Sequence, residues 1–481
     1  MPLILPGNVG SATAATGYDV ANSCRFDGAT NSDECLIKTF GTATSRKKFT
    51  YSVWVKLSGR GQGNNNALLV AGTSGQDEGT IKISPDVIDW SEYSASSASV
   101  TARLTTTQVF RDYSAWSHLV FVWDSGNATA GNRMRIYHNG SEITSFSTDT
   151  NPSEDQDAQV NNNVVHNIGR QSWNNSGEWN GYMAEACFID GQALLPTAFG
   201  EFESDSGIWR PIDVSGLTFG NNGFYLEFKQ SGTGTNASGI GADTSGNTNH
   251  FAVNNLTAVS QSTDTCTNNF CTLNPLTNED TDITISEGNL NYANSGSGDE
   301  TIFASIGVSS GKWYFETKWI DTSNYMDIGV GSADEGDIGS PRADAEGTGY
   351  YMIQLRTASP GTRPFDNGSA GSGLGNSSAN DINMFAIDMD NNKFYAGKNG
   401  TWYSSGDPAN NSNPLITMDD GYTTLIPIVC GKSDSAVSVN FGSPSYAISS
   451  GNTDGNGYGN FEYAVPSGYY ALNTKNLAEY G

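Results

Sequence analysis

The chain has 481 residues, and its 24 basic and 51 acidic residues give a formal net charge of −27. Hydrophobic residues make up 36% and aromatic residues 11%, enough to build folded cores, which excludes a wholly disordered protein. The acidic balance also excludes a nucleic-acid partner, because phosphate binding needs clustered Lys and Arg. The length predicts two or three domains.

The first segment, residues 1–14, is a short arm bounded by Pro and Gly. It lacks a basic region followed by an apolar core, so we expect no secretion signal. A segment this short cannot fold alone, and we expect it to become ordered against a partner protein. No apolar run approaches the roughly 18 residues of a membrane span, so we expect no membrane insertion.

Alternation of apolar and polar residues predicts β-strands along most of the chain. In Phe49–Leu57, the odd-numbered residues face one side and Thr50, Ser52, Trp54 and Lys56 the other, which predicts a half-buried antiparallel strand. Asn-Gly and Asp-Gly pairs favour tight hairpins between strands. Helical signal is confined to a turn near Pro196–Phe202, so the predicted fold class is all-β. Further strands are predicted at Ser117–Trp123, Arg133–Tyr137, Met183–Ile189, Lys312–Trp319, Met384–Asp390 and Ala436–Phe441.

The spacing of these signals predicts two β-sandwiches. A first set of strands occupies residues 15–212 and a second set residues 288–481, and a bridge rich in Gly, Asn and Thr at 213–287 separates them. A strand followed by Asn-Gly occurs in both halves, ending at Gly140 and at Gly400, which favours two related sandwiches.

Several segments resemble known domains. One group is similar to the laminin-G-like jelly roll of the concanavalin A-like lectin/glucanase superfamily: Tyr51–Lys56, Trp116–Asp124, Arg133–Gly140 and Gly181–Gly191. A second group resembles SPRY domains, which are bent β-sandwiches: Gly311–Glu316, Asp327–Gly331, Phe385–Asp390, Lys393–Trp402, Ser405–Pro408, Val437–Gly442 and Gly468–Leu477.

The bridge is similar to a segment found between these two modules in structural proteins of bacteriophages, particularly marine ones. The segments that carry this resemblance are Phe199–Phe202, Gly207–Pro211, Gly223–Phe228, Asp243–Asn249 and Thr267–Pro275. The resemblance implies a virion surface protein, either a tail fibre or spike or a head fibre. It further implies synthesis in the host cytoplasm and incorporation into the particle.

No segment offers strong catalytic chemistry. A glucanase needs two carboxylates on alternate residues of one strand, facing one cleft. Glu185 and Asp190 are five residues apart and do not meet this requirement. Asp388 and Asp390 have the spacing but run into a hairpin turn, so a solvated strand end is the alternative to catalysis. The histidines are dispersed, and we expect His118 to be a core or rim residue rather than a metal ligand.

Sugar binding needs aromatic faces for C–H groups and amide or carboxylate partners for hydroxyls. The loop at 170–180 offers such groups, and so does the second half of the chain. The alternative is that these aromatic residues cap the sandwiches or pack between subunits, whereas Trp313 and Trp319 are expected in the core. The candidate glycan- or receptor-binding residues are Trp173, Asn174, Asn175, Trp179, Asn180, Tyr325, Arg342, Trp402 and Tyr403.

Calcium is the one cofactor that the sequence suggests. Hard oxygen ligands cluster in one loop at Asp149, Glu154, Asp155 and Asp157, although a solvated acidic loop is the alternative. No EF-hand register is present.

We therefore expect a non-enzymatic virion protein. The arm would bind other virion proteins, and the sandwiches would present loops to a host-surface glycan or protein. Phage fibres imply a homo-oligomer such as a trimer, although no heptad repeat enforces one. Two alternatives stay open: a purely structural capsid decoration protein, and a polysaccharide depolymerase that uses Asp388 or Asp390.

Overall fold

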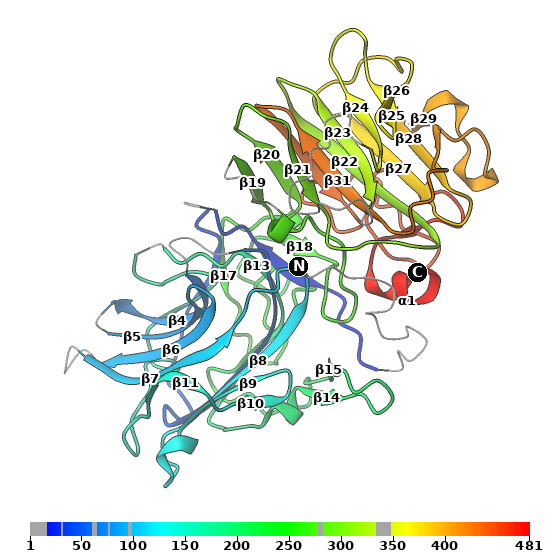
Figure 1. Cartoon of the computed structure of the whole chain (residues 1–481). Helices are drawn as coiled ribbons and strands as arrows, with labels where there is room; N and C mark the ends of the chain where they lie inside the picture. The colour runs from blue at the N-terminus through cyan, green and yellow to red at the C-terminus, as the bar shows by residue number, and fades with distance from the viewer. Residues whose placement is uncertain are drawn as a thin grey trace. The chain divides into compact units, whose positions relative to one another are not determined.

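The computed structural model divides into two compact units, the first unit at residues 16–267 and the second unit at residues 268–481. It is nearly all-β, as predicted, and each unit contains two large sheets (Figure 1). The predicted arm, residues 1–14, lies outside the described residues. The described residues are 17–29, 32–59, 65–75, 77–94, 99–174, 176–277, 282–332 and 348–481.

The first unit is a sandwich of two eight-stranded antiparallel sheets. Figure 1 shows the sheet with β4–β7 lying across from the sheet with β8–β10. One sheet runs in the order β10 (Ser141–Ile143), β9 (Met134–His138), β8 (Trp116–Asp124), β3 (Lys48–Leu57), β13 (Gly181–Asp190), β1 (Ser23–Phe26) and β18 (Gln261–Ser262), with β16 (Phe224–Leu226) also pairing with β13. The other runs β11 (Phe146–Thr150), β7 (Ser99–Val109), β6 (Val87–Ser94), β5 (Asp77–Ile83), β4 (Asn66–Ser74), β12 (Val165–Ile168), β2 (Cys35–Thr39) and β17 (Ala252–Asn254).

The predicted strand at Phe49–Leu57 is confirmed as β3, but both of its faces are buried. Its odd-numbered residues pack in the core between the sheets, whereas Trp54 packs in a second apolar cluster with Val20, Ala184 and Trp209. The prediction of a half-buried strand was therefore wrong for the outer face. The reason is a further layer, which includes the hairpin of β14 (Gly200–Phe202) and β15 (Trp209–Pro211).

The predicted bridge is divided between the two units. Its residues up to Thr267 belong to the first unit, where β16 pairs with β13, β17 with β2 and β18 with β1. These strands contain only two or three residues, too few for alternation to reveal. The buried ion pair between Lys56 Nζ and Asp264 Oδ2, at 2.7 Å, also joins this segment to β3.

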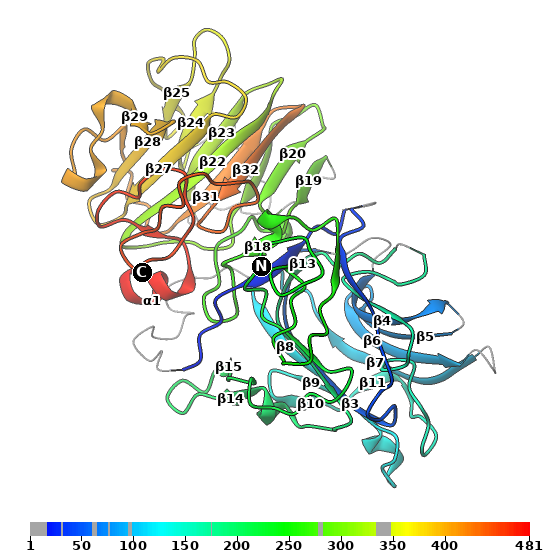
Figure 2. The same cartoon turned by 180° about the vertical axis from the view of Figure 1, so that it is seen from behind.

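The second unit is built on a nine-stranded and a six-stranded sheet, which Figure 2 shows from behind. The first has the order β19 (Ile283–Ser286), β20 (Asn291–Asn294), β32 (Ser435–Asn440), β22 (Lys312–Thr322), β27 (Ile382–Asp388), β28 (Lys393–Lys398) and β29 (Thr401–Trp402), while β30 (Ile416–Thr417) pairs with β28 and β33 (Tyr470–Ala471) with β22. The second has the order β21 (Glu300–Phe303), β31 (Leu425–Gly431), β23 (Met326–Ser332), β24 (Tyr350–Leu355), β25 (Arg363–Asp366) and β26 (Ser369–Ala370).

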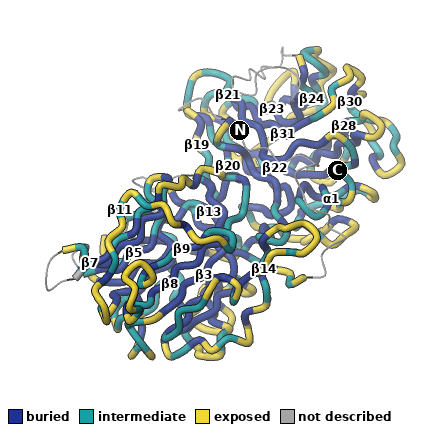
Figure 3. The backbone as a smooth tube through the Cα atoms, turned by 60° about the horizontal axis from the view of Figure 1, so that its bottom comes forward, coloured by how far each residue is buried: buried dark blue, intermediate teal, exposed yellow. Residues whose placement is uncertain are grey.

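Burial follows the strands in each unit, as Figure 3 shows in dark blue. Trp313 and Trp319 are fully buried in the core of the second unit, which confirms their prediction. His118 is likewise buried, stacked on Trp54 with ring centroids 4.7 Å apart.

Helical structure is limited to short segments. The turn predicted near Pro196–Phe202 is confirmed as η5 (Pro196–Ala198), but α1 (Thr474–Tyr480) was not predicted from the sequence. The side chain of Asn473 caps α1 by accepting a hydrogen bond from the backbone N–H of Asn476. The described residues contain no helix long and apolar enough to cross a membrane. The other 3-10 turns are η4 (Ala130–Asn132), η6 (Ala258–Ser260), η7 (Pro275–Thr277), η8 (Tyr403–Ser405) and η9 (Pro408–Asn410).

Candidate binding site

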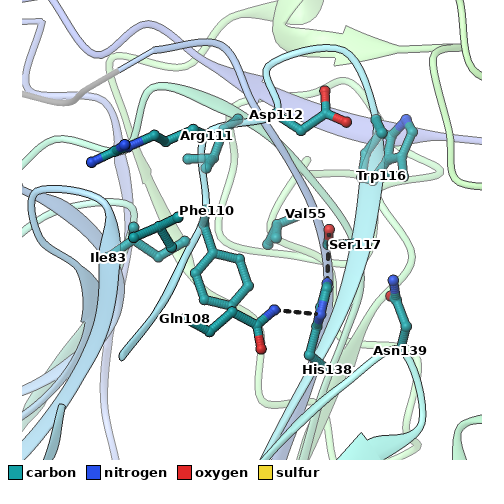
Figure 4. A pocket seen from close by; sticks show the side chains of 13 residues that line it. Val55, Ile83, Gln108, Phe110, Arg111, Asp112, Trp116, Ser117, His138 and Asn139 are labelled. Atoms are coloured by element: carbon teal, nitrogen blue, oxygen red, sulfur yellow. Dashed lines mark hydrogen bonds between the residues drawn. The ribbon is translucent and has the colours of Figure 1, made fainter. Parts of the chain in front are cut away.

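A cavity of about 260 Å³ opens in the first unit where its two sheets separate, and we call it the β7–β8 cavity. This volume is near the lower end of small-ligand pockets, roughly 300–1,000 Å³, and suits one sugar ring better than a long chain. Figure 4 shows side chains from both sheets around it. The lining residues are Val55, Leu57, Ile83, Gln108, Val109, Phe110, Arg111, Asp112, Ala115, Trp116, Ser117, His138 and Asn139.

A hydrogen-bonded chain fixes the polar groups of the cavity. Gln108 Nε2 donates to His138 Nδ1 over 2.9 Å, and the other ring nitrogen of His138 lies 3.3 Å from Ser117 Oγ (Figure 4). Because Nδ1 accepts, the neutral ring carries its proton on Nε2. Burial lowers the pKa of His138, so the imidazole is uncharged at neutral pH.

Aromatic rings supply the apolar side of the cavity. Phe110 meets the His138 ring edge-on, with centroids 5.2 Å apart. The half-exposed Trp116 is held in place because its Nε1 donates to Asp264 Oδ1 over 2.9 Å. Its indole meets the ring of Tyr182, on the face of β8 opposite Ser117, so Phe110 is the aromatic ring beside the polar chain. An immobilised aromatic ring can stack on the C–H face of a sugar without losing rotamer freedom on binding.

The two charged residues at the cavity are already engaged. Arg111 Nε donates to Asp86 Oδ2 over 2.8 Å, and Asp112 accepts from the backbone N–H and the hydroxyl of Ser114. The site therefore combines fixed aromatic surface with neutral amide and imidazole groups. This combination suits a neutral, hydroxyl-rich ligand.

Glu185 is a buried carboxylate in β13, where the strand has a β-bulge. The register against β3 shifts between Ala184 and Cys187, and Glu185 adopts a φ of 50°. Its Oε2 accepts hydrogen bonds from the hydroxyls of Tyr18, at 3.2 Å, and of Tyr225. Burial raises its pKa to about 7. The adjoining cavity of about 10 Å³ has room for one water and no sugar.

The loop at 170–180 does not form the predicted tryptophan pair. Trp179 is fully buried in the core between the sheets, so its assignment as a ligand contact was wrong. Trp173 is 40% exposed, and its Nε1 donates to Glu78 Oε2 over 2.6 Å. Asn174 accepts from Ser176, and the backbone N–H of the partly buried Asn180 donates to the side chain of Asn66. Asn175 lies outside the described residues. Trp173, Asn174 and Asn180 stay predictions.

The predicted residues of the second unit lie at different places. Trp402 is half-buried against Tyr314 and Tyr395, and Tyr403 packs against the main core, both as in the capping alternative. Tyr325 lies beneath the guanidinium of Arg356, whose Cζ is 4.8 Å from the ring centroid. Arg342 lies outside the described residues.

The acidic pair at the end of β27 lies at a hairpin turn, where Asp388 is buried and Asp390 is exposed. Asp388 is fully buried and pairs with Lys312 Nζ at 2.9 Å. It also accepts from the backbone N–H groups of Asp390 and Asn391, and Asp390 accepts from the backbone N–H of Gly311. Both carboxylates thus hold the turn, and the prediction of a solvated strand end was wrong for Asp388.

The predicted calcium ligands do not converge. Glu154 pairs with Arg133 at 3.3 Å, Asp155 with Lys47 at 3.2 Å and Asp157 with Arg46 at 3.9 Å. Asp149 accepts from the amide of Asn151. Over the described part of the chain, no group of three or more His, Cys, Asp or Glu side chains is placed to hold a metal ion. The four carboxylates are therefore not brought together as a calcium site, because each has its own partner.

Thermal unfolding tests this correction. We expect the melting temperature to be the same in excess calcium and in excess EDTA, because the carboxylates at 149–157 already have partners. Calorimetry of the full chain measures this. A rise of several degrees with calcium, abolished by Asp155→Asn, would restore the metal site.

Comparison with known families supports a lectin-type domain in the first unit. A family described as the concanavalin A-like lectin/glucanases superfamily matches residues 27–195. This part of the first unit is therefore similar to that superfamily. The match contains all thirteen lining residues of the β7–β8 cavity. No curated protein matches the sequence.

Solved structures give weaker likenesses. The chain is similar to the SPRY domain of human HERC1, with 19% identity, a TM-score of 0.27, and coverage of 35% of this chain and 96% of that domain. It is similar to a SAP-like pentraxin from Limulus polyphemus, with 18% identity, a TM-score of 0.27 and coverage of 37% and 80%. A putative carbohydrate binding protein from Bacteroides ovatus has 16% identity, a TM-score of 0.32 and coverage of 46% and 55%. TM-scores this low carry no argument about function.

The cavity was not predicted from the sequence. The residues that form its polar chain and its aromatic side come from β7, β8 and β9 and the segment between the first two. The sequence feature that could have indicated it is Trp116, which immediately precedes the predicted strand at Ser117–Trp123.

Proposed function

We propose that this chain is a non-enzymatic binding protein and that the β7–β8 cavity takes one sugar unit of a surface glycan. The observation that carries the proposal is the Phe110 ring beside the hydrogen-bonded, neutral Gln108 and His138 groups of the cavity. The laminin-G-like match over residues 27–195 supports it, since the described family includes lectins.

We further propose that the protein is carried on the surface of a phage particle, where it binds a host envelope glycan. The support is the resemblance of the two modules and the segment between them to phage structural proteins. Synthesis in the host cytoplasm, oligomerisation and contact with other virion proteins through residues 1–14 belong to the same proposal. A cavity for a single sugar unit binds weakly, and many copies on one particle would supply avidity.

Absence of catalysis is part of the proposal and has structural support. In the alternate-residue pair, Asp388 is buried in an ion pair with Lys312, and the exposed Asp390 accepts from the backbone of Gly311. Glu185 borders a space that admits no sugar. Neither arrangement leaves two opposed carboxylates around an open cleft.

A glycan array with the full chain and matched variants tests the cavity. We expect Phe110→Ala to weaken binding to the best glycan about tenfold, the loss of roughly one stacking contact. Phe110→Tyr keeps a ring and should retain most of the affinity. Trp173→Ala is the matched control, because Trp173 is an exposed tryptophan on the same unit.

The variants also distinguish the two aromatic sites. Equal binding by Phe110→Ala and wild type, or loss only in Trp173→Ala, would contradict the cavity as the binding site. Near-ultraviolet circular dichroism of each variant separates lost binding from lost folding. Normal adsorption of particles that lack the protein, together with reduced head stability, would instead favour the capsid-decoration alternative.

A further inference from the structure

Two arginines flank one hairpin loop of the second unit. Arg356 directly follows β24, and Arg363 is the first residue of β25. Segment 374–377 fixes the loop between them: the backbone N–H of Thr362 donates to Gly375 O over 2.7 Å, and that of Ser377 donates to Arg356 O over 2.8 Å. The two arginines therefore start from a rigid backbone.

Both guanidinium groups converge on one neutral acceptor. Arg356 Nε donates to Gln354 Oε1 over 2.6 Å, and Arg363 Nη2 donates to the same oxygen over 3.2 Å. Each guanidinium also lies over an aromatic ring, Arg356 over Tyr325 and Arg363 over Phe365, at 4.8 and 4.7 Å. Two like charges are thus held side by side, an arrangement that costs free energy unless an anion lies between them.

The described residues supply no direct counter-charge. None of the ion pairs within the described ranges includes Arg356 or Arg363, although the chain has 51 acidic residues. The nearest carboxylate in the same cross-strand row is Asp327, which Gln354 Nε2 contacts at 3.4 Å. Asp327 is fully buried, and burial raises its pKa well above its usual range, an effect that the nearby charges of Arg356 and Arg363 oppose.

Both arginines are only partly buried, so solvent reaches them from one side. Arg363 Nε is buried and has no hydrogen-bond partner. A buried donor without a partner is a position that a ligand or water would satisfy.

We propose that Arg356 and Arg363, which we call the arginine pair, form a second binding site that takes the carboxylate of an acidic saccharide such as a uronate. A planar carboxylate matches two guanidinium forks, each able to donate two parallel hydrogen bonds. The rim of the half-exposed Tyr325 adds an aromatic surface for the C–H groups of the sugar ring.

The saccharide is favoured over other anions for two reasons. A long polyanion such as a nucleic acid would be repelled by the net charge of −27. A peptide carboxylate would not use the aromatic rim of Tyr325. The site is distinct from the β7–β8 cavity and does not depend on the function proposed for it.

Titration calorimetry of the full chain with trigalacturonate, and with its methyl ester as the uncharged ligand, tests the proposal. We expect trigalacturonate to bind, the ester to bind at least about tenfold more weakly, and added salt to reduce the affinity for the acid. Arg356→Gln and Arg363→Gln should each weaken the acid about tenfold, the loss of one charged hydrogen-bonding group. The affinity of Arg356→Lys for the acid should lie between those of wild type and Arg356→Gln, because lysine keeps the charge but lacks the two-pronged guanidinium.

Two controls isolate the site. Lys47→Gln makes the same charge change at the exposed pair with Asp155 on the first unit and should leave trigalacturonate affinity unchanged. Phe110→Ala should also leave the trigalacturonate affinity unchanged, so failure of the cavity and failure of the arginine pair are separate results. The proposal would be overturned by equal binding of the acid and the ester, or by tighter binding of an acetylated Asp peptide. Unaltered affinity for the acid in both Arg→Gln variants, with their melting temperatures preserved, would also overturn it.

Discussion

Replacing Asp264 by alanine is expected to destabilise the first unit by about 3–5 kcal/mol, the range for breaking a buried ion pair. Asp264 and Lys56 are both buried, and their charged atoms lie 2.7 Å apart. The variant would leave the Lys56 ammonium buried without this carboxylate, and Trp116 would lose its hydrogen bond to Asp264 Oδ1. Chemical unfolding of the full chain, followed by tryptophan fluorescence, measures the loss.

Three comparisons define the origin of that loss. Lys56→Met combined with Asp264→Ala removes the uncompensated charge and should recover much of the stability. Asp264→Asn keeps a hydrogen-bond acceptor for Trp116, so its loss of stability measures the effect of removing the negative charge alone. Lys47→Ala breaks an exposed pair with Asp155 and should change stability by no more than about 1 kcal/mol. A small effect of Asp264→Ala would mean that residues 213–267 are not an integral part of the first unit.

The stability of the first unit is expected to fall as the pH rises from about 5 to 8, and Glu185→Gln should remove about 3 kcal/mol of this dependence. The pKa of Glu185 is raised from 4.5 to about 7, mainly by burial, with a smaller contribution from the charge of Glu227, and opposed by the hydrogen bond from Tyr225. The folded chain therefore holds this proton more tightly than the unfolded chain. The resulting stability is fully present below pH 4.5 and is lost as the pH passes 7.

Unfolding free energies of wild type and Glu185→Gln across this pH range test the expectation. The difference between the two proteins should grow in favour of the variant with rising pH, since glutamine does not ionise. Glu92, whose pKa burial raises to about 8, is present in both proteins, so its contribution cancels. A difference independent of pH would show that Glu185 is ionised in the folded protein at every pH tested.

The sequence predicts the long strands well because they carry enough residues to show a period. Phe49–Leu57 repeats its alternation over a complete strand, and β3 coincides with it to one residue. By contrast, β16 and β18 contain three and two residues, so no period exists to detect. The seven-residue helix α1 depends on the Asn473 cap and on packing of Leu477, which local propensity does not reveal.

The candidate site was harder to predict because it depends on burial and on distant residues. Trp116 and Trp179 both follow polar segments, but Trp179 is fully buried and Trp116 reaches the cavity. The polar chain joins Gln108, Ser117 and His138 from three strands, and only the pairing of β8 with β9 brings two of them together. The calcium ligands predicted at 149–157 were hard to judge for a related reason. Arg46 and Lys47, the partners of Asp157 and Asp155, are about a hundred residues away in sequence.

Both large sheets of the first unit end on short strands. In one sheet the outermost strands are β10 and β18, with three and two residues, and in the other they are β11 and β17, with five and three. Such short borders expose few unpaired backbone N–H and C=O groups, so a neighbouring copy has little on which to extend the sheet. Molecules crowded at high local density would therefore resist edge-to-edge aggregation.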